Sequence, residues 1–536
     1  MIERRRLRAP QQDGGVLIEP PLHLLPGLVA ANVAARSAQG AAASSPTRQA
    51  AARRETIDAA LAYTRVYRDV APPADGSNVL LSGHQPEMFH PGVWAKNFVL
   101  AGLARELNAT AINLVVDGDT MKSASLRVPT GSADEPAVEA LPFDGPAEAI
   151  PYEERTVVDR AVWASFGERV AAALRPWGID PLMRRFWPEA VEAERATGRI
   201  GIAIARARHR LEATLGLQTL ELPQGLLCDT AAFRDFLGAL LADLPRFVEI
   251  HNTALREYRR AHRIRSANHP VPALECDGPW CEAPAWVWTV DAPQRRRLFV
   301  RRLGDGWELT DRDRVHLHAP HDSDGTALSE AMRAWSGRGV RIRSRALLTT
   351  SYARVVLGDL FIHGIGGAKY DELTDVLIDR YFGIRPPRFA VVTATRHLPL
   401  GDAARTAEFP DDATPRLWDL AHHPERYVEL NGPDDAGDAE RVRLLIDEKR
   451  RWIGIAPTRE NARGRCLAIR AINDELRRWT GERRAEAERR ERLRDAQVRR
   501  RRIRESREYG FPLFRESELF DFLLEINGRQ RYLIDR

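Results

Sequence analysis

The sequence predicts an α/β protein built on a parallel sheet. Apolar runs at 78–83 and 110–116 flank an amphipathic stretch, and all three fall within about 45 residues, as in a βαβ unit. A similar element follows at 341–396, and from about 437 onward the chain is helical and charged. Runs that are apolar throughout indicate strands covered on both faces, which is typical of parallel sheets.

The length of 536 residues predicts about three to five structural units, at roughly 100–200 residues each. The chain is 44% hydrophobic and 29% charged, which excludes collagen, mucin and largely disordered proteins. We divide it into an N-terminal helical lead (1–75), a first half of the core (76–122), an insertion or substrate-covering region (123–340), a second half of the core (341–396) and a C-terminal helical region (397–536) with an arm at about 470–508.

The elements follow from local patterns. Residues 30–68 look helical, with Ile57, Leu61 and Tyr67 on one stripe. A strand at 78–83 leads to a helix that starts near Pro91, where the missing proline N–H costs least. We expect helices at 161–174, 231–244 and 253–264, a Trp-rich stretch with Trp280, Trp286, Trp288 and Trp307, a helix over about 368–382 and a strand at 389–395.

Cysteine content and the N-terminus indicate the compartment. Four cysteines, at 228, 276, 281 and 466, are too few and too scattered for a disulfide scaffold and favour a reducing environment. Arg4–Arg6 resemble the start of a secretory signal, but Glu19 and several prolines break the apolar stretch. No window approaches the roughly 18 apolar residues of a membrane span. We expect a cytoplasmic protein without a membrane partner.

The first candidate site follows the strand at 78–83. Gly83, His84 and Gln85 come at its end, and His90 precedes the next helix. Ligands of open α/β sheets lie outside the carboxyl ends of strands, where a helix N-terminus attracts anions. The two histidines could donate to a phosphate or a developing negative charge, or they could only satisfy turn and cap hydrogen bonds.

Two further segments could bind ligands. Asp117-Gly118-Asp119 ends the next strand and could hold a ribose, a metal-bound phosphate or an amine, or form a simple turn. His363 to Gly367 form a Gly-rich loop that could approach a phosphate through Gly364, Gly366 and Gly367, or be a tight turn.

Lysine usage supports a function for these segments. The chain has 80 Lys and Arg residues but only four lysines, and three of them, Lys96, Lys122 and Lys369, lie within a few residues of the three segments. Lysine is a compact point cation that binds phosphate and can lose its proton when buried, whereas guanidinium stays charged.

Cys276, Cys281 and His269 could begin a zinc site, but no second cysteine pair completes it. The tryptophans nearby are either core residues or a cover for a base or sugar.

Together these motifs resemble the bacillithiol biosynthesis cysteine-adding enzyme family. The resemblance rests on the strand followed by GHQP, the acidic strand end about 30 residues later, and the downstream Gly-rich loop whose helix ends at Phe382-Gly383 before Pro386-Pro387. It covers 78–122 and 340–396, roughly a fifth of the chain. It implies a Rossmann-like core related to nucleotidyltransferases and class I aminoacyl-tRNA synthetases, a C-terminal coiled coil for dimerisation, and an activity that joins cysteine to glucosaminyl malate.

The resemblance also assigns residues. It puts Gly83, His84 and Gln85 at the nucleotide or substrate pocket, with Asp119, Arg345, Gly364 and Gly367 across from them. The family follows its Gly-rich loop with Glu, where this chain has Ala368 and later Asp371-Glu372. Its acidic strand end reads Glu-Asp-His-Asp, against Asp-Gly-Asp-Thr here. The substrate of this chain therefore need not be the same.

The leading hypothesis is a ligase or transferase that binds a nucleotide and joins cysteine or a similar amine or thiol to an acceptor. Its catalytic residues would be His84, His90, Asp119 and Lys369, and its binding residues Gly83, Gln85, Lys96, Asp117, Arg345, His363, Gly364, Gly366 and Gly367. His84, His90 and Lys369 would act on phosphate or an oxyanion, Asp119 on an amine or ribose, and Arg345 on a carboxylate. ATP or ADP, with Mg²⁺, are the candidate cofactors, and no metal-ligating residues are assigned.

Two alternatives remain. One is a nucleotidyl- or adenylyltransferase with a different acceptor, which would release pyrophosphate. The other is a noncatalytic coiled-coil protein that binds nucleic acid through 477–507, a segment with 14 Arg and 6 acidic residues. The acids form i,i+4 pairs such as Glu486 with Arg490 and Glu488 with Arg492, so this looks like a solvated helix. We expect a homodimer through this arm and no nucleic-acid partner.

Overall fold

The structure is a computed structural model that describes residues 7–39, 46–74, 76–146, 148–304, 306–322, 324–401, 417–428 and 436–528. Arg4–Arg6, considered above as a signal, lie outside these ranges. The chain divides into two compact units. The first comprises 1–132, 138–399 and 505–536, and the second comprises 133–137 and 400–504.

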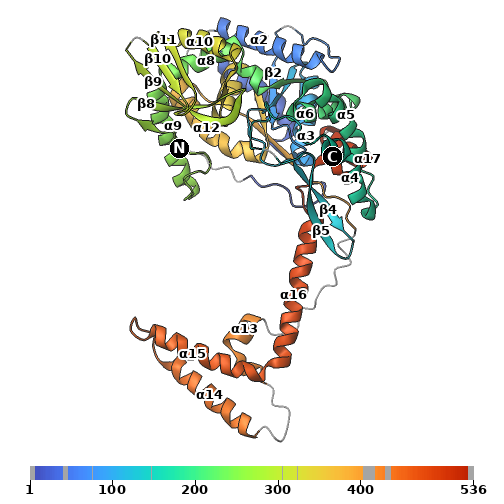
Figure 1. Ribbon diagram of the computed structural model, residues 1–536, viewed down its shortest axis with the longest axis vertical. Coiled ribbons are helices and arrows are strands. Elements are labelled where there is room, and N and C mark those ends of the chain that lie inside the picture. Colours follow the sequence, from blue (N-terminus) through green and yellow to red (C-terminus); the bar gives the residue numbers. More distant parts are fainter. Residues whose placement is uncertain are drawn as a thin grey trace. The chain divides into compact units, whose positions relative to one another are not determined.

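A six-stranded sheet forms the centre of the first unit (Figure 1). Its strands, in spatial order, are β1 (Val16–Glu19), β14 (Ala390–Ala394), β13 (Leu360–His363), β2 (Val79–His84), β3 (Thr110–Val115) and β6 (Leu220–Pro223). β1 is antiparallel to β14, and the other neighbours are parallel. β3, β6, β13 and β14 are buried throughout, which is why β3, β13 and β14 are almost wholly apolar runs. The predicted α/β class with parallel strands is confirmed.

The strand order fixes where a ligand site belongs. Numbered along the chain, the five parallel strands run 3-2-1-4-5 across the sheet, which is the order of a doubly wound sheet. The connections leave β2 and β13 in opposite directions, so the switch point lies between these two strands. Crevices outside the carboxyl ends at such a point are the usual ligand sites.

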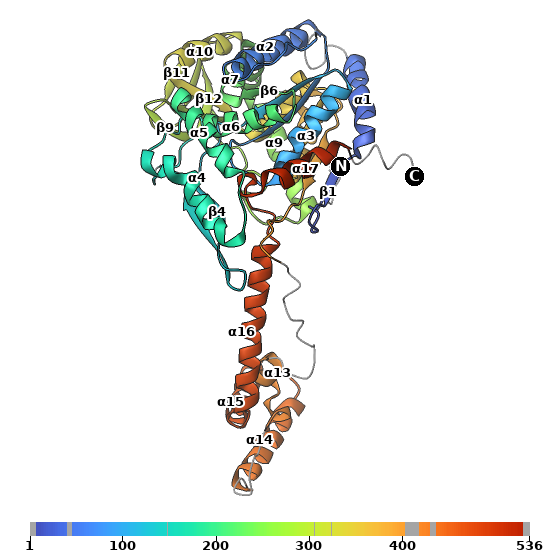
Figure 2. The ribbon, with the colours of Figure 1, turned by 90° about the vertical axis from the view of Figure 1, so that its right-hand side faces the viewer.

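The described part of the first unit contains helices that pack on its sheets and on one another. In order they are α1 (Leu25–Gln39), α2 (Pro46–Arg65), α3 (Pro91–Glu106), α4 (Arg160–Leu174), α5 (Met183–Thr197), α6 (Ile200–Thr214), α7 (Gln224–Cys228), α8 (Ala231–Ala242), α9 (Leu244–His262), α10 (Thr326–Gly337), α11 (Ala346–Tyr352), α12 (Ile365–Phe382) and α17 (Glu516–Gly528). α9 and α12 pack together, and α17 packs on α3 (Figure 2). Figure 1 shows α9 and α12 on the side of the antiparallel sheet that is described next, and α3, α5, α6 and α17 on the other side.

The region 123–340 contains more than an insertion. β6 from this region joins the central sheet, which the sequence analysis did not foresee. The remainder includes a two-stranded sheet of β4 (Ser125–Gly131) and β5 (Pro136–Pro142). It also forms most of an antiparallel sheet, called here the second sheet, in the order β11 (His316–Pro320), β10 (Gly306–Thr310), β9 (Ala292–Leu303), β8 (Trp280–Thr289) and β12 (Val340–Ser344), with β7 (Cys276–Asp277) paired to β8.

The Trp-rich stretch lies in this second sheet. Trp288 of β8 and Trp307 of β10 are buried, so these two are core residues, whereas Trp286 is only half-buried. One hydrophobic core connects the second sheet to the central one, and it includes Leu81, Val287 and Leu298. Burial of this apolar surface attaches the second sheet firmly to the first unit.

Two of the four cysteines pair. A disulfide joins Cys276 to Cys281, while Cys228 is a buried free thiol and Cys466 an exposed one. With both sulfurs bonded to each other, the zinc site considered for Cys276, Cys281 and His269 does not form.

The second unit is helical. Its helices are α13 (Leu417–His422), α14 (Ala436–Gly454), α15 (Ala462–Leu476) and α16 (Gly481–Arg504). Val442, Leu445, Ile472 and Leu476 form its core, between α14 and α15. The arm expected at about 470–508 is not one helix, because a 3₁₀ turn at Arg477–Trp479 separates α15 from α16.

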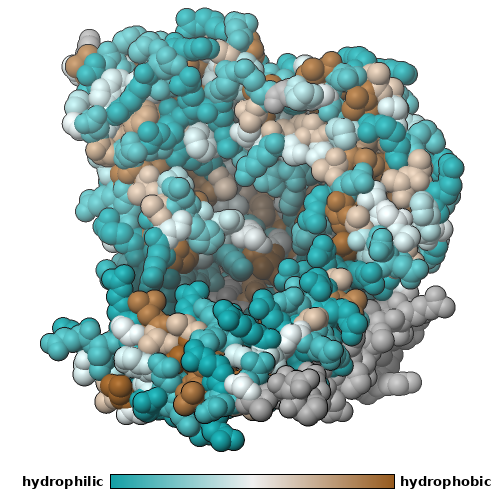
Figure 3. Space-filling view, turned by 60° about the horizontal axis from the view of Figure 1, so that its bottom comes forward, coloured by the Kyte–Doolittle hydropathy of each residue, from teal (hydrophilic) through white to brown (hydrophobic). Residues whose placement is uncertain are grey.

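The Arg-rich α16 carries ion pairs on its surface. The predicted pair of Glu486 with Arg490 is present at 2.9 Å, while Glu488 pairs with Arg484, also at 2.9 Å. The surface shown in Figure 3 is mainly hydrophilic, and its hydrophobic residues occur in small groups. In the described part of the chain, no helix is both long and apolar enough to cross a membrane.

Candidate functional site

The end of β2 carries a neutral histidine. His84 is the last residue of β2; its Nδ1 lies 3.1 Å from the carbonyl oxygen of Gln85, and its ring packs edge-on against Phe89. Burial, followed by the positive charge of Lys96, lowers the pKa of His84 to about 3. His84 can therefore form hydrogen bonds near neutral pH without carrying a charge.

His90 caps α3. Its Nδ1 accepts a hydrogen bond from the Gly92 N–H at 3.1 Å, so the cap alternative considered for this histidine is realised. Burial, with Arg507 and Lys96, lowers the pKa of His90 to about 4. A side chain at Gly92 would collide with the carbonyl oxygen of Ala394, so glycine lets the start of α3 approach β14.

Lys96 connects the two strands of the switch point. It extends from α3 with 2% of its surface exposed, and its Nζ donates to the carbonyl oxygen of Gly83 at 2.7 Å. A Cβ at Gly364 would lie 3.9 Å from Lys96 Cδ, so the lysine passes beside the start of α12. Burial and the charge of Arg208 lower the pKa of Lys96 to about 7. An ammonium has three donors, so two remain for a ligand beside Gly83.

The end of β13 is held by ion pairs. His363 Nε2 and Arg354 Nη1 both contact Asp371 Oδ2, at 2.7 and 2.8 Å. Burial alone would raise the pKa of Asp371, but the charges of His363 and Arg354 hold it well below its usual value. The imidazole is thereby fixed in the fold.

The glycines of the next loop differ in their surroundings. A Cβ at Gly367 would lie 2.6 Å from His363 Nδ1, so this glycine makes room for the histidine. A Cβ at Gly366 would meet nothing within 4 Å, and Gly364 caps α12 without a side-chain hydrogen bond. The first amides of α12 are thus available to an anion at an open surface.

A pocket of about 390 Å³ lies beside the loops that follow β2 and β3. Gln85 Nε2 donates to Asp119 Oδ2 at 2.8 Å, and Arg295 Nη1 of β9 donates to Asp119 Oδ1 at 2.7 Å and to the Gly118 carbonyl at 3.0 Å. The pocket is lined by Gln85, Pro86, Glu87, Met88, Asp119, Thr120, Lys122, Ser123, Ser125, Leu126, Phe143, Tyr152, Ile204 and Arg295. The sequence analysis missed Arg295, because only folding brings it to Asp119 from 176 residues away.

Asp117 and Arg345 lie apart from this lining. Asp117 is buried, with its Oδ1 accepting from the Gly225 N–H at 2.9 Å, and burial with the charge of Glu153 raises its pKa to about 8. Arg345 contacts Glu282 at 2.6 Å and stacks on Trp286, against which Arg295 also stacks. Arg345 therefore reaches the pocket only through its neighbours.

Lys369 lies in the first turns of α12, three residues after Gly366, with its side chain exposed. Residues i and i+3 share a helix face, so the ammonium of Lys369 can lie over the open surface beside Gly366.

The structure thus brings seven of the predicted residues to three places: Gln85 and Asp119 in the pocket, Gly83, Lys96 and Gly364 at the switch point, and His363 with Gly367 at the end of β13. Asp117 and Arg345 are not among them. Among the residues placed by the structure, no group of three or more His, Cys, Asp or Glu side chains could hold a metal ion. Comparison with known proteins found no matching family model and no matching curated protein.

Proposed function

We propose that this chain is a cytoplasmic ligase or transferase with a Rossmann-like core, resembling the cysteine-adding enzymes of bacillithiol biosynthesis. It binds a nucleotide at the switch point and joins cysteine, or a similar small amine or thiol, to an acceptor. The observation that carries the proposal is Lys96, a buried lysine whose Nζ lies at the carboxyl end of β2 while its stem passes Gly364 at the start of α12.

The switch point suits the phosphates of ATP or ADP. The first amides of α12 and the positive end of its dipole favour an anion, and the open space over Gly366 allows close approach. Lys96 adds a point charge from α3, beside the end of β2. A magnesium ion, where required, would arrive with the nucleotide and be ligated mainly by its phosphates. Bound ATP would supply an activated phosphoryl or adenylyl group.

The pocket suits the small substrate. Its volume of about 390 Å³ is within the usual range for small-molecule sites. The carboxylates of Asp119 and Glu87 can hold an amine, and Arg295 and Lys122 can hold a carboxylate. An amino acid carries both groups, so cysteine matches the lining.

Lys96 is also suited to move a proton. With its pKa near 7, it exchanges between ammonium and amine at neutral pH, as a general acid or base requires. In this proposal the neutral His84 and His90 position groups by hydrogen bonding and carry no charge.

Calorimetric titration of the full chain with ATP and ADP, with and without Mg²⁺, tests the nucleotide site. We expect binding that Lys96→Met abolishes. Lys449→Met is the matched control, because Lys449 is equally buried but lies in the second unit, where its Nζ contacts the His422 carbonyl and Glu425. No binding by the wild type, or equal binding by Lys96→Met, would contradict the proposal. Turnover that releases pyrophosphate would instead support adenylyl transfer.

A homodimer through the second unit forms part of the proposal. Leu444 of α14, Leu467 of α15 and Leu493 of α16 are each about half exposed, outside the core that α14 and α15 share. Because the family resembled above dimerises through its C-terminal coiled coil, we take these leucines as the candidate residues of a partner surface. Sedimentation velocity should show a dimer that Leu467→Ser with Leu493→Ser dissociates. Leu303→Ser, at a comparably exposed leucine of the first unit, should leave it intact. A monomeric wild type would contradict this part.

A further inference from the structure

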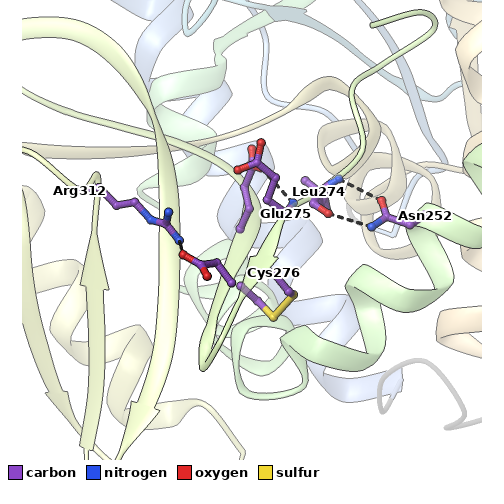
Figure 4. Close-up of a disulfide and its surroundings, with 8 residues drawn as sticks. Asn252, Leu274, Glu275, Cys276 and Arg312 are labelled. Carbon is purple, nitrogen blue, oxygen red and sulfur yellow. Dashed lines mark hydrogen bonds and ion pairs between the residues drawn. A yellow bond between two sulfur atoms is a disulfide. The ribbon is translucent and has the colours of Figure 1, made fainter. Parts of the chain in front are cut away.

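The disulfide closes a short hairpin at the margin of the second sheet. Cys276 of β7 lies directly opposite Cys281 of β8, and their Cα atoms are 4.2 Å apart (Figure 4). Only residues 277–280 lie between them. Cross-linking so short a loop removes less entropy from the unfolded chain than closing a long one. Stabilisation of the whole fold is therefore a weak explanation for this pair.

One end of the disulfide is open to attack. Cys276 is exposed, whereas Cys281 is buried. Thiol–disulfide exchange requires a thiolate to reach one of the two sulfurs. An external thiol can approach Cys276 at the surface and attack its sulfur, and the sulfur of Cys281 is then the leaving group.

The hairpin holds a buried carboxylate. Glu282 follows Cys281, its side chain is 1% exposed, and its oxygens contact Arg345 at 2.6 Å and Arg297 at 3.3 Å. Its backbone N–H donates to the Glu275 carbonyl at 2.7 Å, and the Glu275 N–H donates to its carboxylate at 3.2 Å. The position of Glu282 therefore depends on the pairing of β7 with β8.

The β7 end of the hairpin also has noncovalent anchors, among them the ion pair of Glu275 with Arg297 of β9 at 2.6 Å. Asn252 of α9 exchanges two hydrogen bonds with the backbone of Leu274, at 2.8 and 2.9 Å, which Figure 4 shows beside the disulfide. Arg312 contacts Asp277 at 3.4 Å, and this pair is largely exposed. Between Leu274 and the turn, the disulfide is the covalent link that keeps β7 on β8.

A series of side-chain contacts connects Glu282 of the hairpin with the pocket. Glu282 holds Arg345, whose guanidinium lies 3.9 Å from the ring centre of Trp286. Arg295 lies 4.4 Å from the same ring centre and donates to Asp119 in the pocket. A shift of Glu282 would therefore reach Asp119 through contacts that are all present in the structure.

We propose that Cys276–Cys281 is a thiol-reducible switch that controls how firmly Arg345 and Trp286 hold Arg295 at the pocket. The proposal rests on the proposed function for what the switch regulates, but not for its chemistry. Disulfides in reducing compartments are usually transient, catalytic or redox-sensing, which fits the cytoplasmic location proposed above.

The reductant is a small or protein dithiol. Its first thiolate attacks the Cys276 sulfur, the bond between the two cysteines breaks, and Cys281 leaves as a thiolate that takes up a proton. The second thiol of the reductant then attacks the mixed disulfide and releases Cys276 as a thiol. Two electrons and two protons pass to the protein, and the reductant becomes an intramolecular disulfide.

Alkylation and hydrogen exchange of the full chain test the switch. Dithiothreitol in native buffer should open the pair, which mass spectrometry of alkylated peptides detects, and oxidised glutathione should restore it. Reduction should speed amide exchange about tenfold in β8 from Glu282 onward, in 343–348 and in 118–120. Cys276→Ser with Cys281→Ser should reproduce this effect without reductant, and Cys466→Ser, at an exposed free cysteine, should not.

Two results would overturn the proposal. One is a pair that becomes alkylated only after the protein is unfolded by denaturant. The other is reduction in native buffer that changes exchange only within 276–281, which would mean a local staple. Neither measurement uses a nucleotide or substrate, so failure of the switch and failure of the proposed function are distinguishable.

Discussion

The two strands at the switch point end in histidines with opposite surroundings. His363 of β13 contacts the carboxylate of Asp371, which Arg354 also contacts, and α12 begins two residues later. His84 of β2 has a carbonyl oxygen and an aromatic ring as neighbours, and six residues separate it from the start of α3. The first histidine is held by a buried carboxylate, and the second, which is neutral, lies beside a longer loop.

This difference assigns different tasks to the two strand ends. The ion pairs at β13 give a rigid base for the start of α12, whose outer face stays open at Gly366. The loop after β2 contributes Gln85 and Glu87 to the pocket instead. In the proposed function, an anion site at the start of α12 would lie beside a substrate loop after β2, because adjacent parallel strands end at the same edge.

The largest effect should follow from removing the charge at β13. Asp371→Ala removes the buried carboxylate that both Arg354 and His363 contact, although Arg354 keeps Asp375 at 2.5 Å, so we expect a loss of about 2–4 kcal/mol in the free energy of unfolding. Urea denaturation measures it. Asp379→Ala on an exposed position of the same helix should change stability by less than about 0.5 kcal/mol. Equal effects of the two variants would mean that the buried pairs do not hold β13.

Lys96 should give the β2 side a pH-dependent stability. Its pKa is about 7 in the folded chain and near 10.5 when unfolded, so between these values the unfolded chain binds more protons. The stability of the wild type relative to Lys96→Met should therefore rise with pH, by up to about 1.4 kcal/mol per pH unit between pH 7.5 and 9.5. Urea denaturation across this range measures it. Parallel curves for the two proteins would show that Lys96 keeps its proton.

His84 should have its effect in acid. Its pKa is about 3 in the folded chain and near 6.5 when unfolded, so the unfolded chain gains a proton first as the pH falls from 6.5 to 3. The wild type should lose stability more steeply over this range than His84→Gln, which cannot take up that proton. Circular dichroism during acid titration measures the two slopes. A variant with the wild-type slope would contradict the neutral state assigned to His84.

Local patterns were sufficient for part of the fold. The largely apolar runs at 78–83, 110–116 and 389–395 predict the buried strands β2, β3 and β14, and Pro91 and Gly383 mark helix ends for steric reasons. GHQP and the Asp-Gly-Asp turn were correctly expected at strand ends. Each directly follows an apolar run, so its place depends on the local sequence and not on contacts with distant segments.

The remainder depends on contacts between distant segments. β6 has four residues with Glu221 among them, and this carboxylate is buried because Arg208 of α6 and Asn113 of β3 both contact it. Arg295 belongs to a run of arginines without local distinction, and its role follows from the packing of two sheets. Asp117 and Asp119 look equivalent in sequence, but the turn directs one to α7 and the other to the pocket.

The smallest expected change in stability comes from the Gly-rich loop, where two alanine substitutions distinguish a glycine needed for packing from one that leaves room for a nucleotide. Gly366→Ala introduces a methyl into open space at a helical position, so we expect it to stabilise the chain by about 0.4–1 kcal/mol. Gly367→Ala would press against His363 Nδ1 and should destabilise by about 1–3 kcal/mol. Thermal unfolding measures both. If phosphate approaches the amides at the start of α12, Gly366→Ala should also weaken nucleotide binding although the fold is more stable. Unchanged affinity in this stabilised variant would move the nucleotide away from α12 and leave the β2 side, with Lys96, as its binding surface.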